Sequence, residues 1–364
     1  MNIKPKKHIK FLPREGHWIK KSRLGYYTME RNERVDEFSS FEMKSLFKKL
    51  TSFDLRTYPE NNEIYLKVAK WLKVKSNNVI LTEGADGGLL RIFNVFISGG
   101  NKIVALEPSF AMYPLYCKMF NAKYIPFKVN LDSQKDYFYN FINFIKKNKP
   151  KLVAIANPNQ PVEVMFNLKQ IESICKITKK INCLFVVDEA YYHYNKVSAI
   201  TLTKKFENLV VVRTFSKAFG LAGLRIGYSV ADKKLIGYMK SIKPIYEINS
   251  FNIKIINFFL DNIKIMKKNV TLINRSRKHL FDELKKMNIR SLGKYSNTVM
   301  VELKNDKLAK EIQNKLFNKK FIIRQMQVGK NKNYIRITLG SPKVVKKFMF
   351  YLKKIITSSK NNLA

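Results

Sequence analysis

A lysine and an arginine stand eight residues apart in an apolar segment that also contains glycines. Residues 210–212 are all valine and predict a short buried strand, and Lys217 follows it in a turn of small residues. Apolar surroundings disfavour an ammonium ion, so the pKa of Lys217 should fall and its amine should become a usable nucleophile. A glycine-bearing turn would fold Arg225 back toward Ser216. A hydroxyl, an amine and a guanidinium would then converge on one small anionic cofactor.

An acidic residue accompanies this lysine. Asp188 ends another predicted strand, in the sequence Asp188-Glu189-Ala190-Tyr191. An aspartate at a strand-to-helix junction usually caps the helix, and in so basic a chain most lysines are solvated. The position of Asp188 one strand before Lys217 favours a functional pair of acid and amine instead.

These residues carry a family resemblance. The segment 213–225, Arg-Thr-Phe-Ser-Lys-Ala-Phe-Gly-Leu-Ala-Gly-Leu-Arg, resembles the Schiff-base segment of the aminotransferases that use pyridoxal 5'-phosphate (PLP) and have the aspartate aminotransferase fold. Within this family, fold type I and class I/II, it most resembles the histidinol-phosphate aminotransferase branch. The match runs from about Arg31 to about Lys343, with the motifs in the family's order. It implies a PLP cofactor and Lys217, Asp188 and Tyr191 as catalytic residues.

A second motif concerns the cofactor's phosphate. Gly84-Ala85-Asp86 lies between a predicted strand and a predicted helix, where free N–H groups and the helix dipole favour an anion. It resembles the family's phosphate-binding Gly-Ala-Asp, although Gly87 replaces the usual glutamate. The resemblance implies the following phosphate ligands: Gly84, Ala85, Asp86, Ser216, Arg225 and, from the partner of a homodimer, Tyr58.

Four further residues are implied to hold the cofactor ring. Phe110 stands where the family stacks an aromatic side chain, although an aromatic residue after a strand more often packs in the core. Gln160 replaces the asparagine that binds the ring 3'-oxygen, and Val162-Glu163 replace the Thr-Gly that follows. Asp188 would keep the pyridine nitrogen protonated, and Tyr191 would bind the 3'-oxygen.

Two arginines near the C-terminus are implied to bind substrate. Arg336, in Tyr-Ile-Arg-Ile-Thr, matches the family's arginine that clamps an anionic group in a fork. Arg324 matches a second arginine of the histidinol-phosphate branch. The run 31–36 (Arg-Asn-Glu-Arg-Val-Asp) departs from that branch's usual substrate loop, so other phosphorylated or sugar-linked amines stay open as substrates.

Composition limits the other functions. The chain has 364 residues and a net charge of +42, which would suit a nucleic-acid partner. Its lysines are spread over the whole chain, which favours a solvated basic surface that binds polyanions non-specifically. No apolar run is long enough to span a bilayer. Four scattered histidines indicate no metal site, and three cysteines (Cys117, Cys175, Cys183) indicate reduced thiols in a cytoplasmic protein.

Strand and helix patterns alternate through the first two thirds of the chain. Strands are expected over 78–82, 102–106, 123–127, 152–156, 184–187 and 209–213. The longest later helix is expected over 269–287, and a strand over 321–324. The alternation predicts an α/β fold with a mostly parallel, seven-stranded-type sheet flanked by helices and a smaller α/β C-terminal domain.

The domains and the function follow from the resemblance. Residues 1–50 are expected to form an N-terminal arm and small-domain segment, 51–245 the large PLP-binding domain, and 246–364 the connecting helix and C-terminal small domain. The implied activity moves an amino group between glutamate or 2-oxoglutarate and a small phosphorylated amine or amino acid, such as histidinol phosphate. Decarboxylation of a phosphorylated amino acid on the same fold is the main alternative, and a basic nucleic-acid-binding protein is another.

Overall fold

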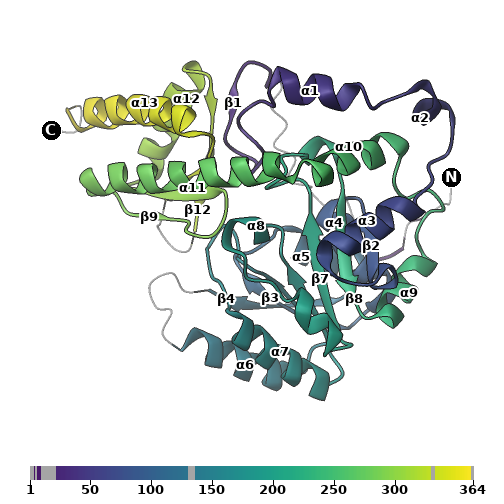
Figure 1. Ribbon diagram of the computed structural model, residues 1–364. Coiled ribbons are helices and arrows are strands. Elements are labelled where there is room, and N and C mark those ends of the chain that lie inside the picture. Colours follow the sequence, from purple (N-terminus) through teal and green to yellow (C-terminus); the bar gives the residue numbers. More distant parts are fainter. Residues whose placement is uncertain (1–3, 5, 10–21, 130–135, 329–332, 362–364) are drawn as a thin grey trace.

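A seven-stranded sheet forms the centre of the protein. The computed structural model describes residues 4, 6–9, 22–129, 136–328 and 333–361 (Figure 1). The sheet order is β2-β8-β7-β6-β5-β3-β4, and only β8 among these runs antiparallel to its neighbours. The strands are β2 (Val79–Thr82), β3 (Lys102–Glu107), β4 (Lys123–Lys128), β5 (Leu152–Ala156), β6 (Leu184–Asp188), β7 (Leu209–Thr214) and β8 (Gly227–Ala231).

The parallel strands are continuous apolar runs because both faces of the sheet are covered. Successive residues of β7 alternate between two core clusters: Val211 belongs to one, and Val210 and Val212 to the other. On the Val210 face pack α4 (Gly84–Phe96), α5 (Met112–Met119) and α9 (Lys233–Ser241). On the Val211 face pack α3 (Asn62–Leu72), α6 (Tyr137–Asn148) and α7 (Leu168–Lys180). This arrangement confirms the predicted α/β class with a mostly parallel sheet.

A second, four-stranded sheet has the order β12-β13-β10-β9 and is antiparallel. Its strands are β9 (Ser291–Leu292), β10 (Thr298–Leu303), β12 (Arg324–Gln327) and β13 (Asn333–Thr338). Three helices accompany it: α11 (Ile263–Lys286), α12 (Asp306–Asn318) and α13 (Pro342–Asn361). Figure 1 shows α11 reaching from α13 to α10 (Ser250–Asp261), so this helix connects the two halves of the molecule.

The N-terminal region joins the C-terminal part of the chain. β1 (Tyr27–Thr28) pairs in parallel with β11 (Phe321–Ile322), and α1 (Ser40–Phe47) and α2 (Ser52–Arg56) follow before α3. Much of the predicted N-terminal arm lies outside the described residues. The predicted strand 321–324 is wrong in its extent, because Ile323 separates β11 from β12 and the two pair with different strands.

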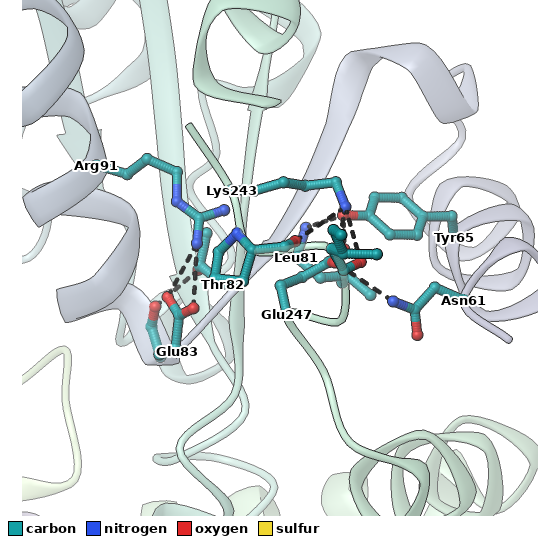
Figure 2. A network of polar contacts seen from close by, with 11 residues as sticks. Asn61, Tyr65, Leu81, Thr82, Glu83, Arg91, Lys243 and Glu247 are labelled. Atoms are coloured by element: carbon teal, nitrogen blue, oxygen red, sulfur yellow. Dashed lines mark hydrogen bonds and ion pairs between the residues drawn. The ribbon is translucent and has the colours of Figure 1, made fainter. Parts of the chain in front are cut away.

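A polar network fixes the segment before α10 against α3 and β2 (Figure 2). The Tyr65 hydroxyl donates to Glu247 at 2.7 Å and accepts from the N–H of Leu81 at 3.1 Å. Lys243 and Asn61 donate to the other oxygen of the same carboxylate, at 2.9 and 3.3 Å. Burial opposes ionisation of this carboxyl, but its donors hold the pKa of Glu247 below the usual value. Among the described residues no helix is long and apolar enough to cross a membrane.

Candidate active site

A cavity of about 580 Å³ opens where the strands of the large sheet end. Parallel strands bring their carboxyl ends to one edge, which is where α/β folds bind ligands. Most of the predicted site residues meet there, and arginines of the small sheet close the cavity from the other side. The predicted residues that line it are Ala85, Asp86, Phe110, Gln160, Asp188, Tyr191, Ser216, Lys217, Arg225, Arg324 and Arg336.

Lys217 lies half-buried in the loop that follows β7. Its Nζ donates to the backbone oxygen of Arg31 at 3.4 Å. Burial lowers the pKa of Lys217 to about 8; Glu33 opposes this fall, and the charges of Arg336 and Arg225 add to it. The lysine is therefore an amine that loses its proton much more easily than a solvated one.

Asp188 is the last residue of β6, and its carboxylate accepts the N–H of Ala190 at 3.0 Å. Burial raises the pKa of Asp188 to about 7; the Ala190 bond opposes the rise, and the charge of Asp86 adds to it. The hydroxyl of Tyr191 accepts a hydrogen bond from Nδ2 of Asn32 at 2.6 Å. The site thus holds a buried acid that is ready to form a hydrogen bond with a basic nitrogen.

An anion-binding corner forms where α4 begins. Gly84 has φ +77°, and a Cβ there would stand 2.8 Å from Nη2 of Arg225, so no larger residue fits without moving that guanidinium. Nη1 of Arg225 donates to Oγ of Ser216 at 3.4 Å. The Asp86 carboxylate accepts the hydroxyl of Tyr116. Helix N–H groups, a hydroxyl and a guanidinium therefore gather at one place, as the sequence predicts.

Gly87, which stands where the family has a glutamate, lies close to the side chain of Glu83. Figure 2 shows Arg91 of α4 pointing at Glu83, with Nη2 at 3.1 and 3.3 Å from the two carboxylate oxygens. A Cβ at Gly87 would lie 2.5 Å from Oε2 of Glu83. Any side chain at position 87 would therefore push Glu83 away from Arg91, which is buried.

Two arginines of the small sheet face each other across β12 and β13. Arg324 and Arg336 are direct cross-strand partners, and both line the cavity. Like charges in this position repel. Burial lowers the pKa of Arg336 to about 10, with the charge of Arg324 adding to the fall and Tyr191 and Glu30 opposing it. Nη2 of Arg336 donates to the backbone oxygen of Glu30 at 2.7 Å, and its buried Nε has no partner among the described residues. An anion between the two arginines would relieve their repulsion.

Phe110 and Gln160 both line the cavity, but only the side chain of Gln160 is held there by hydrogen bonds. Phe110 is 36% exposed and lies nearly perpendicular to Tyr113, with ring centroids 5.7 Å apart, so part of its ring is accessible from the cavity. The amide of Gln160 is bonded to Ser296 and Thr298 of the small sheet region. These partners differ from the ring oxygen that the sequence predicts for it.

Tyr58 lies outside the cavity of this chain. Its ring is 75% exposed and stacks on Tyr246, with centroids 4.3 Å apart and planes 8° from parallel. Tyr246 adjoins Glu247, whose network in Figure 2 fixes the segment before α10. Tyr58 thus lies at the surface of the chain with most of its side chain exposed.

The segment 31–33, part of the run that departs from the branch's usual substrate loop, also lines the cavity. Asn32 has φ +59°, its N–H donates to Oγ1 of Thr338 at 3.0 Å, and its side chain reaches Tyr191. Asparagine is among the few residues that adopt this left-handed conformation readily. That preference is the only local signal, since the partners lie 159 and 306 residues away.

Comparison with known proteins identifies the family. The family model of aminotransferase class I and II matches residues 43–352. A histidinol-phosphate aminotransferase of Thermoanaerobacter pseudethanolicus is 36% identical over 265 residues, which are 71% of this chain and 73% of that protein. Another, from Methanocaldococcus jannaschii, is 32% identical over 64% of this chain and 63% of its own length.

Solved structures share the fold. Histidinol-phosphate aminotransferase from Sinorhizobium meliloti, in complex with pyridoxal-5'-phosphate, has a TM-score of 0.80 and 20% identity, covering 91% of each chain. L-threonine-O-3-phosphate decarboxylase from Porphyromonas gingivalis has a TM-score of 0.75 and 22% identity, covering 91% of this chain and 99% of that one. At these identities the likeness concerns the fold alone.

The chain belongs to the class I and II aminotransferase family. It is a PLP-dependent enzyme of the histidinol-phosphate aminotransferase-like branch. The residues present fit a phosphorylated pyridine. Gly84, which has no Cβ, lets the guanidinium of Arg225 approach the first turn of α4, and a buried acid, Asp188, stands at the cavity wall. Asn32 and Arg336 each contribute a buried polar atom with no partner among the described residues.

Proposed function

We propose that this cavity transfers an amino group between glutamate or 2-oxoglutarate and a small phosphorylated amine such as histidinol phosphate. The observation that most supports this is a lysine of lowered pKa, a buried acid and a pair of opposed arginines in one cavity. The curated relatives support the substrate class, because they are named for histidinol phosphate.

Lys217 is the proposed covalent attachment point for the cofactor and the residue that moves protons. A pKa of about 8 leaves part of the amine uncharged near neutral pH. Once its Nζ is free, it can accept a proton from the substrate's Cα and later return one. The hydrogen bond from its Nζ to the backbone oxygen of Arg31 keeps the lysine side chain in the cavity.

Three residues are proposed to hold the cofactor ring. Bound PLP supplies an electron-accepting pyridinium ring. Asp188 holds the proton on the ring nitrogen, since a buried acid of raised pKa gains most from a cationic partner. Tyr191, fixed by Asn32, binds the ring oxygen through its hydroxyl, and Phe110 offers the accessible part of its ring for stacking.

The anion-binding corner is proposed to hold the phosphate. Gly84, Ala85 and Asp86 contribute the first turn of α4, and Ser216 and Arg225 contribute a hydroxyl and a guanidinium. We also propose that the protein is a homodimer in which Tyr58 of one copy completes the phosphate site of the other. The outward position of the Tyr58 ring supports this, as does its stacking on Tyr246.

Arg336 and Arg324 are proposed to bind the anionic part of the substrate. Two guanidinium groups on adjacent strands form a fork that suits a carboxylate or a phosphate. The same pair would serve glutamate through its carboxylate and the phosphorylated substrate through its phosphate. One site could then accept both partners of the transfer in turn.

The domain division 1–50, 51–245 and 246–364 is part of the proposal. All seven strands of the large sheet fall within 51–245, and all four of the small sheet fall after 246. β1 pairs with β11, which supports the assignment of residues before 50 to the small domain. A cytoplasmic location is supported by three cysteines that are buried and free.

The test is the absorbance spectrum of purified protein with PLP, followed by glutamate and then histidinol phosphate with 2-oxoglutarate. The expected result is a bound-cofactor band that glutamate converts to a different form, and product formation with the second pair. The variant Lys217→Ala should show no shifted cofactor band. A wild-type band that neither amine changes would contradict transamination.

The same assay separates the decarboxylase alternative. A phosphorylated amino acid would then release carbon dioxide, with no net conversion of 2-oxoglutarate to glutamate. The fold is shared with a threonine-phosphate decarboxylase, so the fold does not decide this point. The sequence relatives favour transfer.

A further inference from the structure

Two of the three positions at which this chain departs from the family's Asn-Asn-Pro-Thr-Gly motif reach across to the small domain. These two, Gln160 and Glu163, lie in the loop after β5, on the large domain. Their side chains contact residues 294–298, which are part of the turn between β9 and β10 and the first residue of β10. The sequence shows each departure separately, but the structure brings them together on one target.

Gln160 uses its whole amide group in these contacts. Its Nε2 donates to Oγ of Ser296 at 2.9 Å and to Oε1 of Glu163 at 3.2 Å, and its Oε1 accepts from Oγ1 of Thr298 at 3.0 Å. An amide nitrogen has two hydrogens, so both are engaged. The oxygens of Glu163 accept this bond and the two backbone N–H groups of the turn, which places the nitrogen side of the amide toward Glu163. No hydrogen of Gln160 is left to bind the cofactor's ring oxygen.

Glu163 holds the backbone of the same turn. Its carboxylate accepts the N–H of Tyr295 at 2.8 Å and the N–H of Lys294. Arg277 of α11 also donates to the turn, at the backbone oxygen of Ser296. Burial raises the pKa of Glu163, and the two backbone donors, Arg277 and Gln160 oppose this rise. A glycine at this position would leave both N–H groups without this acceptor.

The turn is mechanically connected to the arginine pair. Thr298 is the first residue of β10, and it pairs with Thr338 of β13. Two residues further along the same ladder, Met300 pairs with Arg336, which in turn pairs with Arg324. A displacement of the turn would therefore move the strand that carries Arg336 relative to the large domain.

We infer that Gln160 and Glu163 are positioning residues: together they clamp the β9–β10 turn onto the large domain and so set the position of Arg336 over the cavity. The clamp itself stands on the hydrogen bonds above. Its effect on substrate rests on the proposed function, in which Arg336 binds the anionic group. Tyr191 is then the side chain that holds the ring oxygen, without help from Gln160.

The first experiment measures the clamp without cofactor or substrate. In the full chain, Glu163→Gly should speed hydrogen exchange at the amides of Lys294 and Tyr295 by ~10- to 100-fold, the range expected for the loss of a charge-assisted hydrogen bond. Glu207→Gly, at an exposed turn before β7, is the matched control and should leave these amides unchanged. Unchanged exchange in Glu163→Gly would overturn the clamp whatever the enzyme's reaction is.

The second experiment distinguishes positioning from direct contact with the cofactor. In the PLP-loaded enzyme, Gln160→Leu should raise the glutamate concentration for half-maximal reaction by ~10-fold or more and change the maximal rate less, because a small misplacement of a binding group is costly. The pH midpoint of the cofactor's absorbance should stay at the wild-type value. Gln170→Leu, the same change in the first turn of α7 and outside the cavity lining, is the control.

The opposite pattern would refute the inference. A shift of that pH midpoint in Gln160→Leu, with unchanged glutamate dependence, would mean that Gln160 binds the ring oxygen as the sequence predicts. Thr298→Val gives an independent check, since it removes the hydroxyl that donates to Gln160 with little change of shape. Its effect and that of Gln160→Leu should not add in the double variant. Full additivity would count against the clamp.

Discussion

At the scale of single residues, Asp188 shows how the site sets function against stability. The carboxyl is buried and its pKa is raised to about 7, because the cavity wall gives it little solvation without a cationic partner. Folding thus raises the pKa from an ordinary value of about 3.9. Between these two pKa values the carboxyl of Asp188 stays protonated in the folded protein and is ionised in the unfolded chain. The stability contributed by the protonated form is complete below the unfolded pKa and is lost as the pH rises through about 7.

This predicts a stabilised but inactive variant. Without cofactor, Asp188→Asn should raise the free energy of unfolding at pH 8 by roughly 2–4 kcal/mol, since one pKa unit corresponds to about 1.4 kcal/mol. The difference should shrink toward zero near pH 4. Urea unfolding at the two pH values measures it, and the glutamate reaction of the loaded variant should fall by ~100-fold or more. A variant less stable than wild type at pH 8 would contradict the burial argument.

Arg336 allows a second test at this scale. Lysine keeps the positive charge but cannot form the two-pronged contact of a guanidinium. Arg336→Lys should therefore raise KM for the anionic substrate by ~10- to 100-fold and lower kcat much less. Arg290→Lys, on the same half of the molecule but away from the cavity, is the control. An equal fall in kcat and kcat/KM would instead assign Arg336 a role only in the transition state.

The sequence could predict residues whose role follows from local context. Asp188 ends one apolar strand and Lys217 follows another, so their meeting at one edge of the sheet could be foreseen. Gln160 could be located in the cavity, but its partners Ser296 and Thr298 lie 136 and 138 residues away. Asn32 could not be found, because its role depends on a contact with Tyr191 that no local pattern announces.

At the scale of elements, a glycine inside α4 makes room for an ion pair between Glu83 and Arg91. Glu83 precedes the helix and its carboxylate accepts a hydrogen bond from Arg91 (Figure 2). A Cβ at Gly87 would lie against the same carboxylate. Alanine normally stabilises a helix interior relative to glycine by about 0.5–1 kcal/mol. Here a Cβ would displace Glu83, so Gly87→Ala should lower the free energy of unfolding by ~1–2 kcal/mol. In a Glu83→Ala background the same change should be neutral or stabilising. Urea unfolding of the four proteins in this cycle measures the coupling, and equal effects in both backgrounds would contradict it.

Helices and strands with a clear hydrophobic pattern could be predicted from the sequence. A strand that forms because it pairs with neighbouring strands could not. The strands 152–156 and 209–213 were expected nearly at their true bounds, because continuous apolar runs suit a sheet covered on both faces. β8 was not predicted: Gly227–Ala231 is short and contains glycine and serine, and it becomes a strand by antiparallel pairing with β2 and β7. The helix expected over 269–287 begins at Ile263, since Met266 also contributes to the core.

At the scale of the whole molecule, several large apolar side chains are exposed on α2, on α3, between these two helices and on the segment before α10. Each is more than half exposed: Phe53, Leu55, Tyr58, Leu66 and Ile245. Tyr58 stacks on Tyr246 of the segment before α10. A monomer rarely leaves such side chains together in water. The proposed homodimer would cover them and would bring Tyr58 to the partner's phosphate site.

The net charge of +42 would give the proposed dimer an unusual dependence on salt. Two copies of so basic a chain would repel each other, while an apolar contact between them would not be weakened by ions. At about 0.1 M salt the screening length is only about 10 Å, and it doubles or triples at lower ionic strength. The dissociation constant of the dimer should therefore fall several-fold when salt is raised from about 0.05 to about 0.5 M.

Sedimentation across this salt range measures the effect, and Leu66→Glu supplies the matched variant. Glutamate at the apolar surface should dissociate the dimer at every salt concentration and weaken PLP binding in parallel, because Tyr58 would no longer reach the second site. Tyr58→Phe should leave the dimer intact and lower PLP affinity by ~10-fold through the loss of one hydrogen bond to a phosphate. A dimer that tightens as salt is removed would mean that ion pairs, and not apolar side chains, hold the two copies together.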